Sequence, residues 1–159
     1  MPEGVDETPA TPIFQPNITG RLLLHAAREF SELLGQRLKT RQHAHLRLRH
    51  ADLIVSLDWE GTRITTLAER AGMTKQAMGQ LVKELEKAGY VERHADVRDR
   101  RAILVKLTAT GTSLLHDIQQ VVGEIEAEYA AVVGAVKLDA VRTVLAALVA
   151  YSRRMQVAE

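Results

Sequence analysis

The stretch from Ile64 to Thr108 constrains the fold of this 159-residue chain more than any other segment. Apolar residues recur at helical spacing before Gly72 and again between Thr74 and Ala88, and Gly89 closes the second run. Two runs typical of strands follow, and they flank a loop rich in arginine and aspartate. These runs are Tyr90–Arg93 and Ile103–Leu107. We therefore expect two helices joined by a tight turn, then a β-hairpin with a charged tip.

This order of elements is that of a winged helix-turn-helix, a module that reads duplex DNA. On its second helix, one face is expected to be core, and it carries Met78, Leu81, Val82 and Leu85. The opposite face is polar, with glutamines suited to adenine and lysines suited to guanine or phosphate. The predicted DNA-binding residues of this face are Thr74, Lys75, Gln76, Gln80 and Lys83.

The hairpin loop carries three arginines within four residues, and an aspartate stands among them. A cationic turn that projects from the core suits the narrow, electronegative minor groove of DNA. The carboxylate would repel DNA unless it holds an arginine in position. We therefore predict that the wing contacts DNA through Arg98, Asp99, Arg100 and Arg101.

Helical apolar patterns also flank this module. We expect helices over about 18–38, over about 44–57, from after residue 111 to about 133, and over about 138–155. Thr19 is the predicted N-cap of the first, and Ile64 is predicted to pair with the hairpin as a short strand. The outer apolar stripes have no obvious partner in so small a module, which favours a homodimer.

The fold class is thus mainly α with a small β-hairpin wing. The predicted organisation is a disordered tail (1–16), a dimerisation helix (17–43), the winged helix-turn-helix (44–108) and dimerisation helices (109–159).

Composition narrows the classes of function. The chain has no cysteine, which excludes disulfides and zinc–thiolate sites within it. No apolar run approaches the length needed to span a bilayer, and the acidic, proline-containing start is unlike a secretory signal. We expect a cytoplasmic protein without a cofactor.

Charge is distributed unevenly despite a net charge of only +1. Residues 36–50 hold five arginines or lysines and no carboxylate, whereas residues 117–128 hold four carboxylates and no arginine or lysine. This asymmetry permits a basic side that faces DNA and an acidic side opposite to it.

The segment LAERAGMTKQAMGQLVKELEKAGYVER, the DRR of the wing and the LVKLTATG that follows resemble the MarR (multiple antibiotic resistance regulator) family of bacterial transcription factors. The resemblance is close from Ile64 to Gly111 and looser over the flanking helices, which resemble that family's dimerisation helices. By position, Arg101 matches the minor-groove arginine and Asp99 the residue that orients it. Lys75, Gln76 and Gln80 match exposed positions of the recognition helix. Val97 and Arg98 depart from the family, which often has proline and an acidic or small residue there.

The resemblance implies a homodimer that binds a pseudo-palindromic operator, with its recognition helices in successive major grooves about 34 Å apart. It also implies a repressor that leaves DNA when a small, often aromatic, ligand binds between the dimerisation and DNA-binding parts. Residues that could line such a cleft are His25, Phe30, His43, His45 and Trp59, although each alone is more typical of a structural or exposed position.

Three other classes of function were weighed against this one. An enzyme is disfavoured because the chain has no phosphate loop, nucleophile elbow or HExxH motif. A metal-responsive regulator would build a site from histidines and carboxylates, for example from His43, His45 and His116. An architectural DNA-binding protein would use the same surface without an operator. The last two remain alternatives to a sequence-specific transcriptional regulator.

Overall fold

The computed structural model describes residues 18–44, 46–97, 99 and 101–157. The predicted tail, His45, Arg98 and Arg100 lie outside these residues. The elements in chain order are α1 (Thr19–Thr40), α2 (Leu48–Val55), β1 (Thr62–Arg63), α3 (Ile64–Ala71), α4 (Lys75–Lys87), β2 (Val91–Ala95), β3 (Ile103–Leu107), α5 (Ala109–Val133) and α6 (Ala135–Val157). The predicted fold class, mainly helical with a small β wing, is confirmed.

A small antiparallel sheet supports the wing. Its strand order is β1-β3-β2, so β3 lies in the centre and pairs with both neighbours. Thr62 lies opposite Val105 in one pairing, and Val91 lies opposite Leu107 in the other. The predicted short strand therefore exists, but it ends one residue before Ile64. Ile64 instead begins α3 and packs against the core from its first turn.

The helix-turn-helix forms as its local sequence predicts. Gly72 ends α3 with φ of 61°, a left-handed conformation that glycine adopts without strain. Thr74 then caps α4, because its hydroxyl accepts a hydrogen bond from the backbone N–H of Ala77 at 3.2 Å. The turn between the two helices is thus fixed at both ends.

Helix ends elsewhere differ from the expectation. Thr19 is the first residue of α1 rather than its cap; the N-cap is Ile18, which makes no side-chain cap bond. The second helix starts later than predicted, at Leu48, because the Arg47 N–H donates to Nδ1 of His50 and closes the first turn there. The last helix starts earlier than predicted, directly after the break at Gly134.

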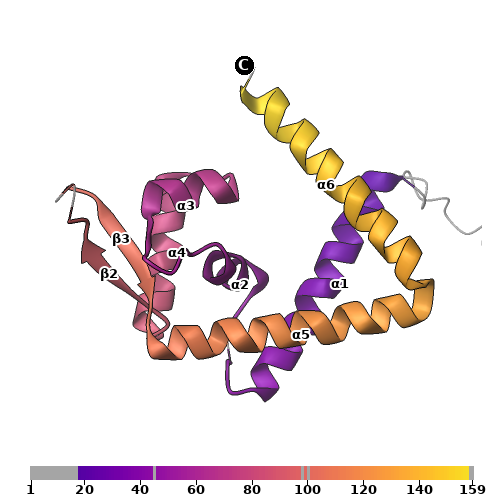
Figure 1. Ribbon diagram of the computed structural model, residues 1–159, viewed down its shortest axis with the longest axis horizontal. Helices are drawn as coiled ribbons and strands as arrows, with labels where there is room; N and C mark the ends of the chain where they lie inside the picture. Colours follow the sequence, from indigo (N-terminus) through magenta and orange to yellow (C-terminus); the bar gives the residue numbers. More distant parts are fainter. Residues whose placement is uncertain (1–17, 45, 98, 100, 158–159) are drawn as a thin grey trace, which may run out of the picture.

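The core forms where α5 meets α1 and α2, and α2 packs in turn against the first helix of the helix-turn-helix (Figure 1). The predicted core face of α4 is confirmed, since all four of its residues are buried. Buried leucines near the end of α1 and aliphatic residues of α5 complete this core; they are Leu34, Leu38, Leu114, Ile118, Val121 and Ile125.

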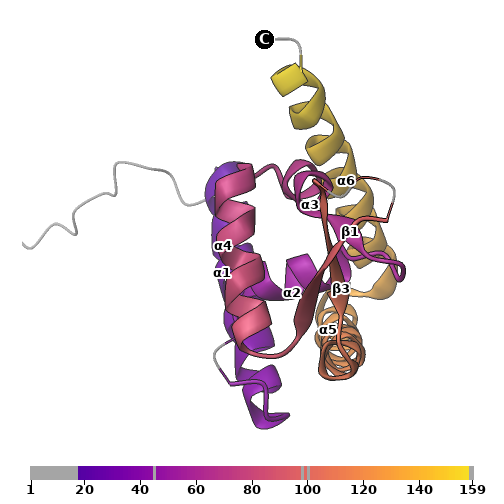
Figure 2. The same cartoon turned by 90° about the vertical axis from the view of Figure 1, so that its left-hand side faces the viewer.

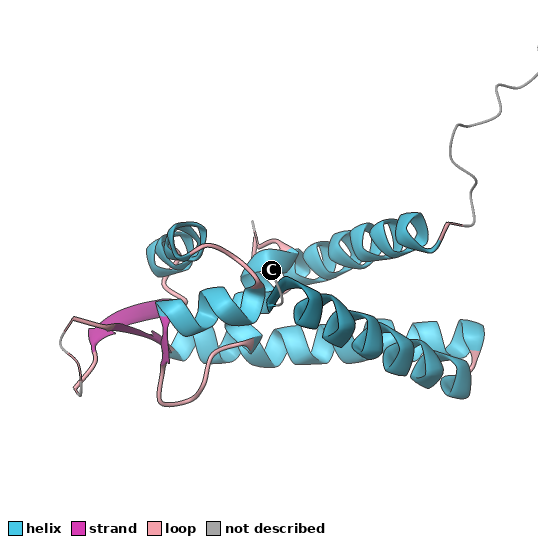
Figure 3. Cartoon of the chain, turned by 90° about the horizontal axis from the view of Figure 1, so that it is seen from above, coloured by secondary structure: helices cyan, strands magenta, loops and turns pink. Residues whose placement is uncertain are grey.

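The molecule is elongated, with the sheet at one end and the junction of α5 and α6 at the other (Figure 3). Away from the core, the apolar side chains of α6 and of the start of α1 remain exposed within the single chain. They include Leu22, Leu23, Val141, Val144, Leu145, Leu148 and Val149. Among the described helices, none is both long and apolar enough to cross a membrane.

Gly111 permits a close approach between α5 and the residue that precedes β2. A Cβ atom at this position would lie 1.9 Å from the backbone oxygen of Tyr90. The same oxygen accepts the backbone N–H of Thr108 at 3.1 Å, so it is held in place by a hydrogen bond. Any larger residue must push α5 away from the start of β2.

We predict that Gly111→Ala lowers the free energy of unfolding by about 3 kcal/mol, the upper end of overpacking costs, because a backbone atom must move. Urea denaturation at fixed protein concentration measures this change. Gly123→Ala in the same helix is the matched control, since a Cβ there meets nothing within 4 Å. The control should stabilise by up to about 1 kcal/mol, and equal behaviour of the two variants would contradict the packing assignment.

Candidate nucleic-acid interface

Helix α4 lies beside the hairpin of β2 and β3 (Figure 2), and its exposed face lines a groove with polar side chains. All five residues predicted to bind DNA from this helix are exposed. They line the same groove, and Arg93 of β2 joins them there; the predicted residues are Thr74, Lys75, Gln76, Gln80 and Lys83. Amide and ammonium groups arranged along one helix face can bond base edges and phosphates.

Two carboxylates at the edge of this face are paired within the protein. Glu84 accepts from Nε2 of His50 at 2.9 Å and from Arg49 at 3.2 Å. The His50 bond, with Arg49 and Gln80 adding to it, holds the pKa of Glu84 below its usual range. Glu86 is paired with Arg93, which lowers the pKa of that carboxyl as well. Their negative charges are therefore partly offset beside the predicted DNA-binding groove.

The base of the wing is held by a buried carboxylate. Asp96, directly after β2, accepts from Nε and Nη2 of Arg63 at 2.9 and 2.5 Å. Its backbone N–H also donates to the oxygen of Ala102 across the hairpin at 3.0 Å. Sequence reasoning missed both Arg63 and Asp96. The available signal was a second aspartate close to the wing arginines, three residues before Asp99.

The tip of the wing is shaped by Asp99. Its side-chain oxygen accepts the backbone N–H of Arg101 at 3.1 Å, and its backbone oxygen accepts the N–H of Ala102 at 2.8 Å. Asp99 thus acts on Arg101 through the main chain, which leaves the Arg101 side chain exposed. Arg98 and Arg100 are not among the described residues, and their predicted DNA contacts stay predictions.

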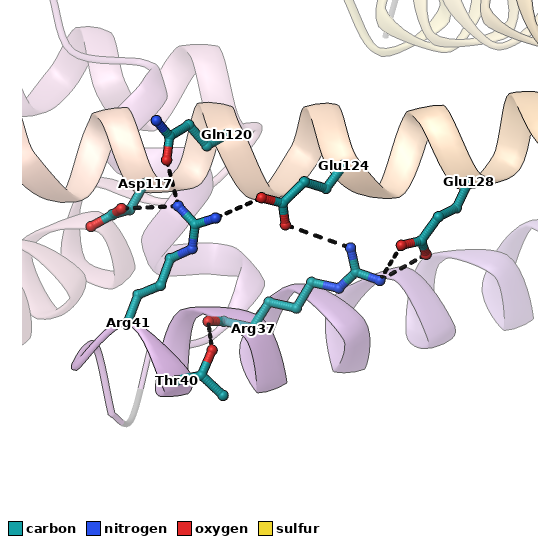
Figure 4. A network of polar contacts seen from close by, with 7 residues as sticks. All are labelled: Arg37, Thr40, Arg41, Asp117, Gln120, Glu124 and Glu128. Carbon is teal, nitrogen blue, oxygen red and sulfur yellow. Dashed lines mark hydrogen bonds and ion pairs between the residues drawn. The ribbon is translucent and has the colours of Figure 1, made fainter.

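The charge asymmetry permitted a basic side opposite an acidic one, but the two runs lie against each other. Arg37 binds Glu128 at 2.7 Å, and Arg41 bonds to Asp117, Gln120 and Glu124 at 3.1, 2.6 and 2.6 Å (Figure 4). The basic run lies at the end of α1, which crosses α5 next to the acidic run. The two runs therefore pair with each other.

A buried histidine joins three elements beside this ionic contact. His43 is 8% exposed; its Nδ1 lies 3.0 Å from the hydroxyl of Tyr90, and its Nε2 lies 2.9 Å from Asp117. Burial raises the pKa of Tyr90, so its hydroxyl keeps its proton as a hydrogen-bond donor. The His43 bond, followed by that of Arg41, lowers the pKa of Asp117. These two hydrogen bonds connect the segment that follows α1, the residue that precedes β2, and α5.

The other residues predicted to line a ligand cleft lie in different surroundings. His25 is exposed on α1, and Phe30 is half-buried on the same helix against the core. Trp59 lies in the turn before β1 and is 76% exposed.

His116, named above for a possible metal site, bonds to the backbone oxygen of Thr112. In the part of the chain that the structure describes, no group of three or more histidine, aspartate or glutamate side chains is arranged to hold a metal ion.

We predict that Asp117→Asn lowers the free energy of unfolding at pH 7 by about 1 kcal/mol, because it removes the charge that His43 and Arg41 bind. The folded-state pKa of Asp117 lies below its ordinary 3.8. The native charge is therefore stabilising above that value, and this stabilisation is lost as the pH falls below it.

Urea denaturation of wild type and variant at pH 7 and at about pH 3 measures this effect, and the difference should shrink at the lower pH. Asp139→Asn, which removes an exposed carboxylate from α6, is the control. A difference that stays constant across this range would contradict the charged contact.

Known proteins resemble this chain in sequence and in structure. The sequence model of the MarR family matches residues 48–102. One crystal structure of MarR has a TM-score of 0.75 and 20% identity, covering 92% of this chain and 99% of that one. No curated protein matches the chain.

Two further similar structures contain a bound partner, DNA in one and a small molecule in the other. A mutant MarR from E. coli, complexed with operator DNA, has a TM-score of 0.70 and 21% identity; 81% of this chain and 91% of that one are covered. CouR from Rhodococcus jostii, bound to p-coumaroyl-CoA, has a TM-score of 0.70 and 25% identity, over 83% of this chain and 92% of that one.

Proposed function

Since this chain belongs to the MarR family through residues 48–102, we propose that it is a homodimeric, sequence-specific DNA-binding transcriptional regulator. The observation that carries the proposal is the polar groove of α4 beside a wing with Arg101 exposed at its tip. A recognition helix fits the major groove, and an adjacent cationic wing fits the minor groove. The location proposed for such a protein is the cytoplasm.

We propose repression as its mode of action and a small ligand as the signal that releases DNA. Similar structures support the proposal that this chain binds DNA and a small ligand. The E. coli MarR structure contains operator DNA, and the CouR structure contains p-coumaroyl-CoA. A ligand acts only if it binds the two dimer geometries with different affinity. His25, Phe30, His43, His45 and Trp59 stay the candidates for its cleft.

The proposed dimer joins two copies through the exposed apolar faces of α1 and α6. Surfaces of this kind are costly to leave in water over a large contiguous area. A two-fold axis through these helices would present two α4 helices to one side of a DNA duplex. An operator with two related half-sites is the matching partner.

We predict that the protein prefers the DNA upstream of its own coding region over a scrambled duplex by 10³ or more, a range typical of specific complexes. Arg101→Ala should weaken binding by well over tenfold, and Gln76→Ala should reduce the preference between the two duplexes. Lys83→Ala should weaken binding to both alike. A fluorescence-anisotropy titration over a salt series measures these quantities.

Lys137→Ala is the control for a lost positive charge, because Lys137 lies in the first turn of α6, and the junction of α5 and α6 lies at the end of the molecule opposite the sheet (Figure 3). Equal binding of wild type to both duplexes, with a steep salt slope, would favour an architectural protein or an operator elsewhere. Unchanged affinity after Arg101→Ala would remove the wing from the proposal.

We predict that Leu148→Asp, at a leucine 42% exposed on α6, converts the dimer to monomer and abolishes preference for the operator. A buried carboxylate at an apolar interface costs several kcal/mol. Analytical ultracentrifugation measures the mass in solution. Val55→Asp is the control, since this 50% exposed valine lies on α2. A variant at Leu148 that remains dimeric would contradict the proposed interface.

A further inference from the structure

A second hollow, which shares Lys75 with the groove of α4, lies between the wing and the beginnings of α3 and α4. Three cationic side chains from three elements line it: Arg63 at the end of β1, Lys75 at the start of α4 and Arg101 in the wing. Thr65 adds an exposed hydroxyl, and Asp99 is the one carboxylate among the described residues of the lining. Since three cationic groups face one carboxylate among these residues, the hollow carries an excess of positive charge. Asp99 also accepts a hydrogen bond from the Arg101 main chain.

Arg63 is held at the edge of this hollow by its partner. The Arg63 side chain is 43% exposed, whereas that of Asp96 is only 10% exposed. Two of the five guanidinium N–H groups, one on Nε and one on Nη2, donate to a single oxygen of Asp96. This arrangement fixes the plane of the guanidinium, and the side chain stays partly exposed, so a ligand can reach it.

The position of the hollow defines what it would face on DNA. A duplex that receives α4 in its major groove and the wing in the neighbouring minor groove has one sugar–phosphate backbone between the two grooves. The hollow lies between α4 and the wing, so it faces that backbone. Arginine and lysine are the side chains that bind phosphate most strongly.

We propose that Arg63 and Lys75 together bind one backbone phosphate between the two grooves, beside Arg101 in the minor groove, and that Asp96 positions Arg63 for this contact. The inference rests on the proposed function, because it takes duplex DNA as the partner. It adds two residues, Arg63 and Asp96, that lie outside the recognition helix and the tip of the wing. A phosphate contact carries no base information, so these residues set affinity and register rather than base preference.

The test compares the salt dependence of DNA binding for wild type, Arg63→Gln, Asp96→Ala and the double variant. Arg63→Gln should weaken binding about tenfold and reduce the slope of log affinity against log salt by about 0.9, the value for one lost phosphate contact. The ratio of affinities for upstream and scrambled DNA should stay unchanged. Arg70→Gln is the matched control, because Arg70 pairs with Asp58 on another side of α3.

Asp96→Ala gives the sharper outcome. Removal of a negative charge near DNA would by simple electrostatics tighten binding, whereas the loss of the Arg63 anchor should weaken it severalfold. In the Arg63→Gln background, Asp96→Ala should have no weakening effect. Thermal unfolding of each variant shows whether the wing and the helices still fold, and Arg63→Lys, which keeps the charge, should retain the wild-type slope.

Each outcome separates the two proposals. If wild type prefers the upstream DNA and Arg63→Gln keeps the full salt slope, the phosphate contact is refuted while the regulator stands. If Asp96→Ala weakens binding equally with and without Arg63, Asp96 acts through the hairpin rather than through Arg63, and its assigned role is wrong. If wild type does not bind duplex DNA at all, both proposals are refuted.

Discussion

The contact between the end of α1 and the middle of α5 determines how the two ends of this molecule are related. Arg41 bonds to three side chains of α5, and His43 links the same helix to Tyr90. Exposed ion pairs of this kind contribute only about 0–1 kcal/mol each. The burial of Leu38 and Ile118 beneath them supplies most of the stability. The ionic contacts instead select one register of α1 along α5, because guanidinium groups and carboxylates must meet at fixed spacing.

The start of α5 connects this contact to the DNA-binding end, both along the chain and through packing. The start of α5 follows β3 after a single residue, and Gly111 lets it lie against the backbone of Tyr90. The central strand β3 pairs with β2 to form the wing, and it pairs with β1 on its other side. Arg63 then joins β1 to the base of the wing through Asp96. Helix α4 and the wing are therefore attached to the same framework that holds α1 and α6, the helices proposed to form the dimer.

Local sequence predicted those features that depend on near neighbours. The core face of α4, the turn at Gly72 and the cap at Thr74 all follow from spacing within one or two turns of helix. Contacts between distant residues were not predictable in this way. The charge runs around residues 37–41 and 117–128 were recognised, but their pairing depends on how α1 crosses α5, which no local pattern contains. The Arg63–Asp96 pair and the His43–Tyr90–Asp117 chain were missed for the same reason.

The length of α5 has a mechanical consequence. Its 25 residues rise about 1.5 Å each, so the helix is a lever of roughly 37 Å. A tilt of only about 5° about one end of this helix would displace its other end by about 3 Å, close to the roughly 3.4 Å rise of one base pair along DNA. A change of angle small enough to be absorbed by side-chain packing at one end of α5 is therefore comparable, at the other end, to a step of one base pair.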